Sequence, residues 1–321
     1  MKKNILLVLF LGLFTFIVTP NVNAQKKKKK KGKVTAPTKP RTKGATLKTL
    51  TSKSEKIDGL FTLYRDTTSG KVFMLIKEEQ LNKEYIYFSY TENGVVAAGH
   101  FRGSFRGSKV FKIRKHFNQI EFEVQNNTYY FDSTLAISKS KDANISNALI
   151  ASEKILNKDV SKGNYVISAD ALFLTEKFQM IKPTPNPLRR GFTLGRLSKA
   201  KTKYKNVKSY PANIDLIVDY VYDNPAPKAG ATAVTDPRSV TITYQHSILA
   251  MPEEGYTPRF DDPRIGYFST QVNDMTTKEA INYRDLIHRW RLVKKNPGAA
   301  LSEPVKPIKY WIENTTPLEY R

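Results

Sequence analysis

Histidine offers the main catalytic or metal-binding chemistry in this sequence, because the chain holds no cysteine. Without Cys there can be no disulfide, thiol nucleophile or Cys-ligated metal. The four histidines are His100, His116, His246 and His288. His246 and His288 lie on the apolar faces of alternating segments, and if those faces met they could form a metal or acid–base pair. A core histidine bonded to the backbone gives the same pattern, and we favour that interpretation.

Carboxylates near these histidines are Asp261, Asp262 and Asp285. In an extended chain, neighbouring side chains face opposite ways, so Asp261 and Asp262 suit a turn better than paired-carboxylate catalysis. The phrase Asp262-Pro263-Arg264 repeats Asp236-Pro237-Arg238, and we interpret both as turns that introduce strands. The sequence contains neither a G-x-S-x-G motif nor a phosphate-binding loop.

Strands must position these residues, since strict alternation runs from Val240 to Ile248 and from Asn213 to Tyr222. Residues 111–114 and 120–124 predict a hairpin with basic side chains opposite acidic ones. We predict further strands at 60–65, 72–76 and 85–90, forming a meander, and at 165–167, 264–270, 286–293 and 308–312. Short helices are predicted at 142–156 and 169–180. The expected fold is mainly β (α+β with few short helices), built from antiparallel meander and hairpin sheets, sandwich- or barrel-like.

The first 24 residues have the form of a signal peptide. Lys2 and Lys3 precede an apolar run from Ile5 to Val18, and Val22-Asn23-Ala24 supplies small residues for cleavage. The run is too short to span a bilayer comfortably, and without Cys a lipid anchor after it is excluded. We expect an exported protein, periplasmic or extracellular, with no transmembrane segment after cleavage.

Positive charge gathers in two places of a chain whose net charge is +24. Residues 25–57 hold thirteen Lys/Arg against Glu55 alone and should be disordered. Residues 182–208 hold nine Lys/Arg and no acid. Candidate polyanion-binding residues are Lys26, Lys27, Lys28, Lys29, Lys30, Lys31, Arg189, Arg190, Arg196, Lys199, Lys201 and Lys203. A solvated tail and a solvated loop are the simpler interpretations of both segments, and we predict no specific nucleic acid partner.

Three phrases resemble a known family: GLFTLYRDTTSG at 59–70, YQHSILAMPEEGYTPRFDDPRIGYF at 244–268 and SEPVKPIKYW at 302–311. In wording, order and spacing they are similar to secreted bacterial zinc-dependent, metzincin-like metalloproteases, which carry a β-rich region of unknown function ahead of the peptidase domain. That family's H-E-x-x-H motif binds zinc through two His and uses Glu as general base. The motif is absent from this sequence.

The resemblance implies a non-catalytic accessory or pro-region whose peptidase domain is missing, with zinc belonging to that domain and no cofactor in this chain. The implied partner is the cognate peptidase domain in cis, whose cleft Asp261 or Asp262 could occlude. The alternative is a stand-alone exported module that binds an anionic glycan or cell-surface polyanion. The expected regions are a signal peptide (1–24), a Lys-rich segment (25–57), β-rich regions (58–181 and 213–304), a basic linker (182–212) and the start of the peptidase domain (305–321).

Overall fold

The computed structural model describes residues 44–157, 159–160, 163–183, 191–252 and 256–321. Predictions for the signal peptide, for Lys26 to Lys31 and for Arg189 and Arg190 lie outside these residues. Among the described residues, none of the helices has the length and apolar character needed to cross a membrane.

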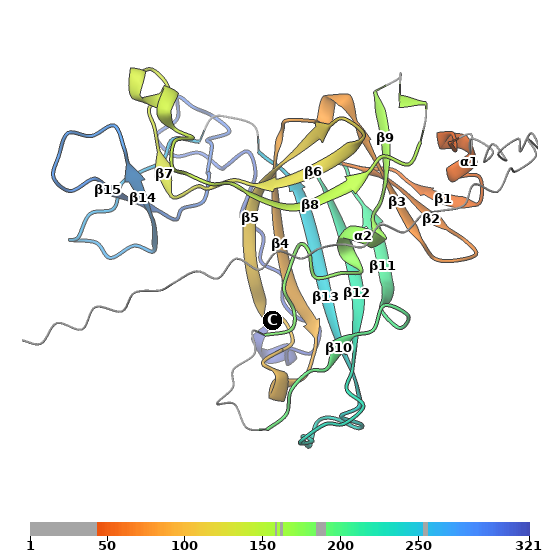
Figure 1. Cartoon of the computed structure of the whole chain (residues 1–321). Coiled ribbons are helices and arrows are strands. Elements are labelled where there is room, and N and C mark those ends of the chain that lie inside the picture. Colours follow the sequence, from red (N-terminus) through yellow and green to blue (C-terminus); the bar gives the residue numbers. More distant parts are fainter. Residues whose placement is uncertain (1–43, 158, 161–162, 184–190, 253–255) are drawn as a thin grey trace, which may run out of the picture. The chain divides into compact units, whose positions relative to one another are not determined.

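The largest element is an antiparallel eight-stranded sheet that curls into a half-barrel (Figure 1). Its strands run in the order β10 (Arg196–Leu197), β12 (Asn213–Asp223), β13 (Ser239–Ala250), β4 (Glu84–Asn93), β5 (Phe105–His116), β6 (Gln119–Val124) and β8 (Ala148–Lys154). Strand β11 (Lys203–Ser209) also pairs with β12. The mainly β, antiparallel and barrel-like fold expected from the sequence is therefore confirmed.

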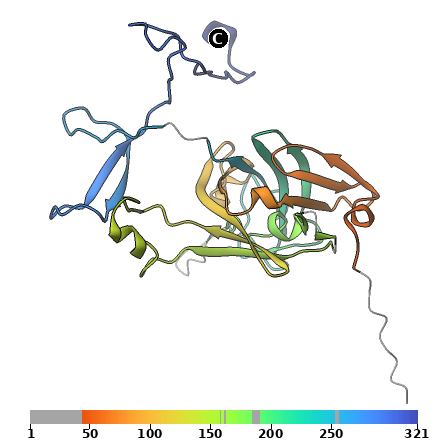
Figure 2. The same cartoon turned by 90° about the horizontal axis from the view of Figure 1, so that it is seen from above.

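Two smaller sheets complete the described chain. One has the order β1 (Ser54–Ile57), β2 (Thr62–Asp66), β3 (Val72–Lys77) and β9 (Asn164–Ser168). The other joins β15 (Tyr283–Ile287), β14 (Ser269–Asp274) and β7 (Tyr129–Tyr130), and Figure 2 shows this β14–β15 hairpin in blue. The helices are short: α1 (Leu47–Leu50), α2 (Asp170–Phe173) and the 3-10 turns η1 (Glu78–Gln80), η2 (Val96–Ala98), η3 (Ala136–Ser140) and η5 (Leu318–Tyr320).

Strict alternation predicted the two central strands correctly. Every second residue of β13 from Val240 to Ile248 is buried, and so is every second residue of β12 from Ile214 to Tyr222. The predicted hairpin is β5–β6, with Lys112 opposite Glu123 and Arg114 opposite Glu121. A one-residue slip would turn each apolar set to the other face, so burial fixes the register.

Two local predictions in the first half were wrong. Residues 142–156 contain the strand β8 instead of a helix, because Ala151 pairs with Phe122 of β6 and is buried there. Tertiary pairing thus overrides a weak helical spacing. The predicted meander is also divided, since β2 pairs with β3 while β4 pairs with β13 and β5 in the large sheet. The predicted helix at 169–180 shortens to α2.

Predictions near both ends need correction as well. Residues 44–57 contain α1 and β1, although disorder was expected through residue 57. The strand expected at 264–270 begins only at Ser269, and the one expected at 286–293 ends at Ile287. Trp290, within the strand expected at 286–293, is 64% exposed. Residues 308–312 form no strand.

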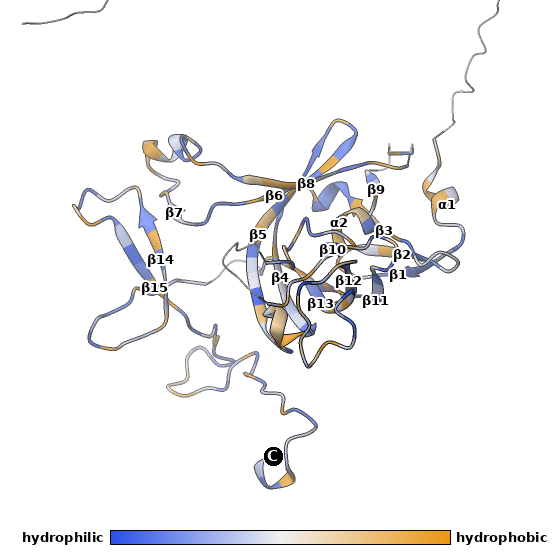
Figure 3. Cartoon of the chain, turned by 60° about the horizontal axis from the view of Figure 1, so that its bottom comes forward, coloured by the Kyte–Doolittle hydropathy of each residue, from blue (hydrophilic) through white to orange (hydrophobic). Residues whose placement is uncertain are grey.

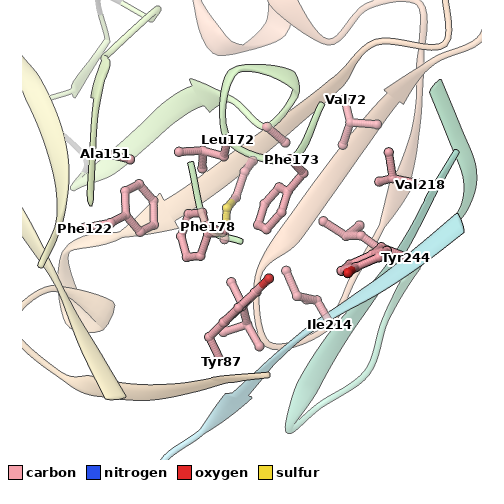
Figure 4. Packing of buried hydrophobic residues seen from close by; sticks show 14 of the residues in the cluster. Val72, Tyr87, Phe122, Ala151, Leu172, Phe173, Phe178, Ile214, Val218 and Tyr244 are labelled. Atoms are coloured by element: carbon pink, nitrogen blue, oxygen red, sulfur yellow. The ribbon is translucent and has the colours of Figure 1, made fainter. Parts of the chain in front are cut away.

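The chain fills the concave face of its own half-barrel. Residues 169–183, which follow β9, place Ala169, Leu172, Phe173, Phe178 and Ile181 in the core. The Phe173 and Phe178 rings stack with their centroids 5.1 Å apart, and Phe178 also contacts Phe122 and Tyr87 (Figure 4). We call residues 169–183 the plug.

The β-rich regions expected at 58–181 and 213–304 share the large sheet. Strand β13 pairs with β4 over eight residue pairs, from Thr243 opposite Asn93 to Ala250 opposite Tyr85. The expected basic linker between them supplies β10 and β11 to the edge of that sheet. The long-range ladder makes the described part of the large sheet one folded body.

Candidate functional site

A cluster of buried tyrosines and histidines lies where the plug meets the concave face of the large sheet. Strand β4 contributes Tyr87, β12 contributes Tyr220, and β13 contributes Tyr244 and His246. These side chains share one face because each stands on the inward-pointing set of its strand. All four are at most 1% exposed.

His246 is held by a hydroxyl group on each ring nitrogen. The hydroxyl of Tyr87 lies 2.8 Å from Nδ1, and the hydroxyl of Tyr220 lies 2.8 Å from Nε2. Tyr220 donates its only proton to the carbonyl of Phe173 in the plug. It must therefore accept from Nε2–H, which leaves Nδ1 to accept from Tyr87. The tautomer of His246 follows from this chain of donors, which ends on the backbone of α2.

Burial keeps these groups uncharged. Burial, and secondarily the Lys109 ammonium, lowers the pKa of His246 to about 3. Burial also raises the pKa of Tyr87 and of Tyr220 well above the usual range. A charged imidazole here would lose its hydration without a carboxylate partner, so the neutral form is the stable one.

A second histidine borders the same cluster. Nδ1 of His100 lies 3.1 Å from the Tyr244 hydroxyl, and burial lowers the pKa of His100 to about 4. In the plug, Glu176 accepts the hydroxyl of Tyr222 at 2.9 Å and the backbone N–H groups of Ile181 and Lys182. This carboxylate therefore fastens the end of the plug to β12.

The cluster is suited to rigidity. His246 is 1% exposed, and both of its ring nitrogens are already hydrogen bonded. A general base must reach a proton of its substrate, and this imidazole faces protein on every side. In the described ranges, no three His, Cys, Asp or Glu side chains are grouped as a metal site would need. The arrangement ties β4, β12 and β13 to the plug.

His246 and His288 do not meet. His288 is exposed directly after β15, where its Nε2 lies 2.7 Å from the hydroxyl of Thr270 in β14. His116 is exposed at the end of β5. The position of His288 therefore rules out the His246–His288 pair considered from the sequence. The interpretation of His246 as a hydrogen-bonded core histidine is confirmed in its burial. Its partners, however, are tyrosine hydroxyls and not backbone groups.

The aspartates are used locally. Arg264 donates two hydrogen bonds to the Asp262 carboxylate, from Nε at 2.9 Å and from Nη2 at 2.6 Å. Arg238 donates to the Asp236 carboxylate through the same two atoms. The Asp262 backbone N–H bonds to the Asp261 carboxylate at 2.9 Å. Each of the two Asp-Pro-Arg segments thus forms the same bidentate ion pair between its Asp and its Arg. A cleft-occluding role for Asp261 or Asp262 stays a prediction.

The described candidates for polyanion binding lie along or before the β11 edge. Lys201 pairs with Asp223 at 2.8 Å. Arg196, Lys199 and Lys203 are exposed and form no ion pair with the described residues. Charged side chains on an edge strand also discourage pairing with another chain.

Sequence reasoning missed the partners of His246. Its inward position followed from alternation, but the contact with Tyr87 depends on the pairing of β4 with β13, whose residues are 159 positions apart. The sequence could have indicated Tyr220, because that residue stands on the predicted inward face of its strand. Nothing in the local sequence marks Glu176.

Comparison with known proteins gives one match. The model of a family described as a domain of unknown function, DUF5117, matches residues 103–295. No curated protein and no solved structure matches. The match spans the strands from β5 to β15 and carries no assignment to metalloproteases. The chain belongs to the DUF5117 family.

Proposed function

We propose that this chain is a non-catalytic accessory or pro-region of an exported zinc-dependent metalloprotease-like protein, and that it works by docking onto the peptidase domain. The proposal rests on the three family-like phrases and on one structural observation. Large apolar side chains stand exposed along residues 256–320, outside the core of the large sheet.

This C-terminal apolar surface, defined as residues 256–320, supports the proposal. Phe268 is 89% exposed and Trp311 is 92% exposed. Other exposed members are Tyr256, Phe260, Ile265, Tyr267, Trp290, Leu301, Tyr310 and Leu318. In Figure 3 the C-terminal stretch carries repeated hydrophobic residues. Soluble proteins rarely leave so many aromatic side chains in water unless a partner covers them. Two of the three family-like phrases overlap this surface.

Steric cover is the form of action that the contacts favour. Asp262 would have to leave the Arg264 guanidinium before it could approach a zinc ion in a neighbouring cleft. Covering a cleft with Phe268 and its neighbours requires no such exchange. The accessory chain would then govern access to the peptidase cleft while the peptidase domain supplies zinc and the general base.

The test is to mix the purified chain with its cognate peptidase domain. We expect a complex in light scattering and a changed rate of peptide hydrolysis. Replacing Phe268 with Ser should weaken both effects, whereas replacing exposed Phe117, in the β5–β6 turn, with Ser should leave them intact. Absence of a complex together with an unchanged hydrolysis rate would reject the proposal.

The exposed basic residues favour a second candidate, a module that binds an anionic glycan or other polyanion. Arg196, Lys199 and Lys203 would supply its charge at the β11 edge. Binding to heparin beads should weaken steeply as salt rises, because such contacts release counterions. Retention that is unchanged by salt would reject this candidate.

A further inference from the structure

A polar hollow on the large sheet has no role in the proposed function. It has a volume of about 290 Å³ and lies where the β6–β8 connection folds over Glu84 of β4 and Lys112 of β5. Asn127, Tyr129, Lys141 and Asp142 line it. A second hollow of about 280 Å³ shares Gln125 and Asn127 with the first.

The second hollow has a different character. Its walls include Ile86, Val110 and Val124. The two hollows therefore adjoin at Gln125 and Asn127, with an apolar end on the sheet and a polar end under the connection. Pockets that bind small ligands commonly combine apolar walls with a few polar groups that set orientation. Each hollow alone approaches the lower end of the size range of such pockets, which begins at roughly 300 Å³.

Hydrogen bonds hold the polar end in place. The side-chain oxygen of Asn147 accepts the backbone N–H of Asn126 at 3.0 Å, and its amide donates to Glu123 at 2.9 Å. Gln125 also donates to Glu123, at 3.1 Å. The backbone carbonyls of Thr128 and Tyr130 accept N–H groups of Asn273 and Met275 beside β14. The loop is thus fixed on both sides before any ligand arrives.

Several polar groups of the lining remain available. The side chains of Asn127, Lys141 and Asp142 form no hydrogen bond or ion pair with the described residues. They offer an amide, an ammonium and a carboxylate, so donors and acceptors are mixed. Tyr129 and Tyr130, which also line the hollow, are 40% and 51% exposed as whole residues.

The charges that line the polar hollow cancel. Lys112 pairs with Glu84 at 3.2 Å, and Lys141 is balanced by the adjacent Asp142. The second hollow adds Lys109, whose ammonium donates to the carbonyl of Phe178 in the plug. In the polar hollow, an anionic ligand would meet as many carboxylates as ammonium groups. A neutral molecule with many hydroxyl groups fits better, because each hydroxyl both donates and accepts, and its C–H faces can lie on tyrosine rings.

We infer that the joined hollows bind a neutral saccharide, with Asn127 and Asp142 holding its hydroxyl groups and Tyr129 stacking on a sugar ring. The lining of this saccharide site shares no residue with the C-terminal apolar surface or with the basic β11 edge. A negative result for saccharide binding would therefore not argue against the proposed docking function. A negative result for docking would likewise not argue against saccharide binding.

Calorimetric titration of the full chain with cellohexaose, maltohexaose, mannohexaose and chitohexaose tests the inference, with a heparin hexasaccharide as the anionic comparison. At least one neutral hexasaccharide should bind. Replacing Asn127 or Tyr129 with Ala should weaken that binding about tenfold or more. The control is Tyr210→Ala, because Tyr210 is 41% exposed, like Tyr129, but lies outside both hollows.

Circular dichroism of each variant separates lost binding from lost folding, and Asn127→Ala serves as the second variant if Tyr129→Ala does not fold. Binding of none of the neutral hexasaccharides would overturn the inference. So would binding that both variants retain, or binding of the heparin hexasaccharide alone.

Discussion

At the residue scale, His246 is a structural imidazole whose two hydrogen bonds join β4, β12 and β13, and Tyr220 extends this chain of bonds to the plug. Replacing His246 with Leu should lower the free energy of unfolding by about 2–4 kcal/mol, since the Tyr87 hydroxyl is left buried without an acceptor. In this variant the Tyr220 hydroxyl keeps its hydrogen bond to the Phe173 carbonyl, so its loss of a partner should contribute less to the destabilisation. Urea unfolding followed by circular dichroism measures both. In a cycle with Tyr87→Phe, purely additive effects would contradict a direct bond.

The same imidazole makes stability depend on pH. The pKa of His246 is lowered to about 3, while in the unfolded chain it lies near 6.5, so the unfolded state binds the extra proton between these values. Stability is therefore fully present above pH 6.5 and is lost as pH falls toward 3, by up to about 1.4 kcal/mol per pH unit. Urea midpoints from pH 7 to pH 4 should fall less in His246→Asn than in the wild type. His116→Asn, at the exposed end of β5, should keep the wild-type slope. Equal slopes in all three proteins would count against this account.

At the element scale, Gly59 allows the chain that leads into β2 of the four-stranded sheet to lie close against the end of β11. The next residue, Leu60, donates its N–H to the Tyr210 carbonyl at 2.6 Å, and Ser209 donates to the Phe61 carbonyl at 2.8 Å. A Cβ on Gly59 would lie 2.6 Å from the Tyr210 backbone nitrogen. Gly59→Ala should therefore cost about 1–3 kcal/mol. Gly230→Ala is the control, because open space surrounds that glycine. A melting temperature equally insensitive to both changes would argue against this close contact.

Elements with one buried face could be predicted from sequence, and their partners could not. Alternation in β12 and β13 identifies the strands and the inward position of His246, because burial of one face imposes a period of two. Strand β8 lacks such a pattern, since Leu149 is exposed and Ala151 buried only by its pairing with β6. The Tyr87 contact and the saccharide hollows arise from pairings between distant segments, which leave no local signal.

At the scale of the whole molecule, the described chain divides into a hydrogen-bonded core and a lightly anchored C-terminal part. The large sheet joins residues 84–154 to residues 196–250 through β4 and β13. After β15, residues 288–321 have mostly exposed side chains and no assigned strand. Local opening should therefore begin in this C-terminal part, where few buried contacts oppose it.

Limited proteolysis tests that division together with the docking proposal. Within the described residues, trypsin should cut first after Arg289, Arg291, Lys294 or Lys295. Sites within β5 and β12 should stay protected, because cleavage requires the backbone to leave its ladder. Mass spectrometry of the early fragments identifies the cuts. If the cognate peptidase domain covers the C-terminal apolar surface, adding it should slow these cuts, and Phe268→Ser should remove part of that protection. Early cleavage inside β4 or β13 would show that the core is not the stable unit.

Unchanged cleavage after residues 289–295 in the presence of the peptidase domain would place the contact of that domain elsewhere on the chain. The C-terminal apolar surface would then not be the docking surface of the accessory role.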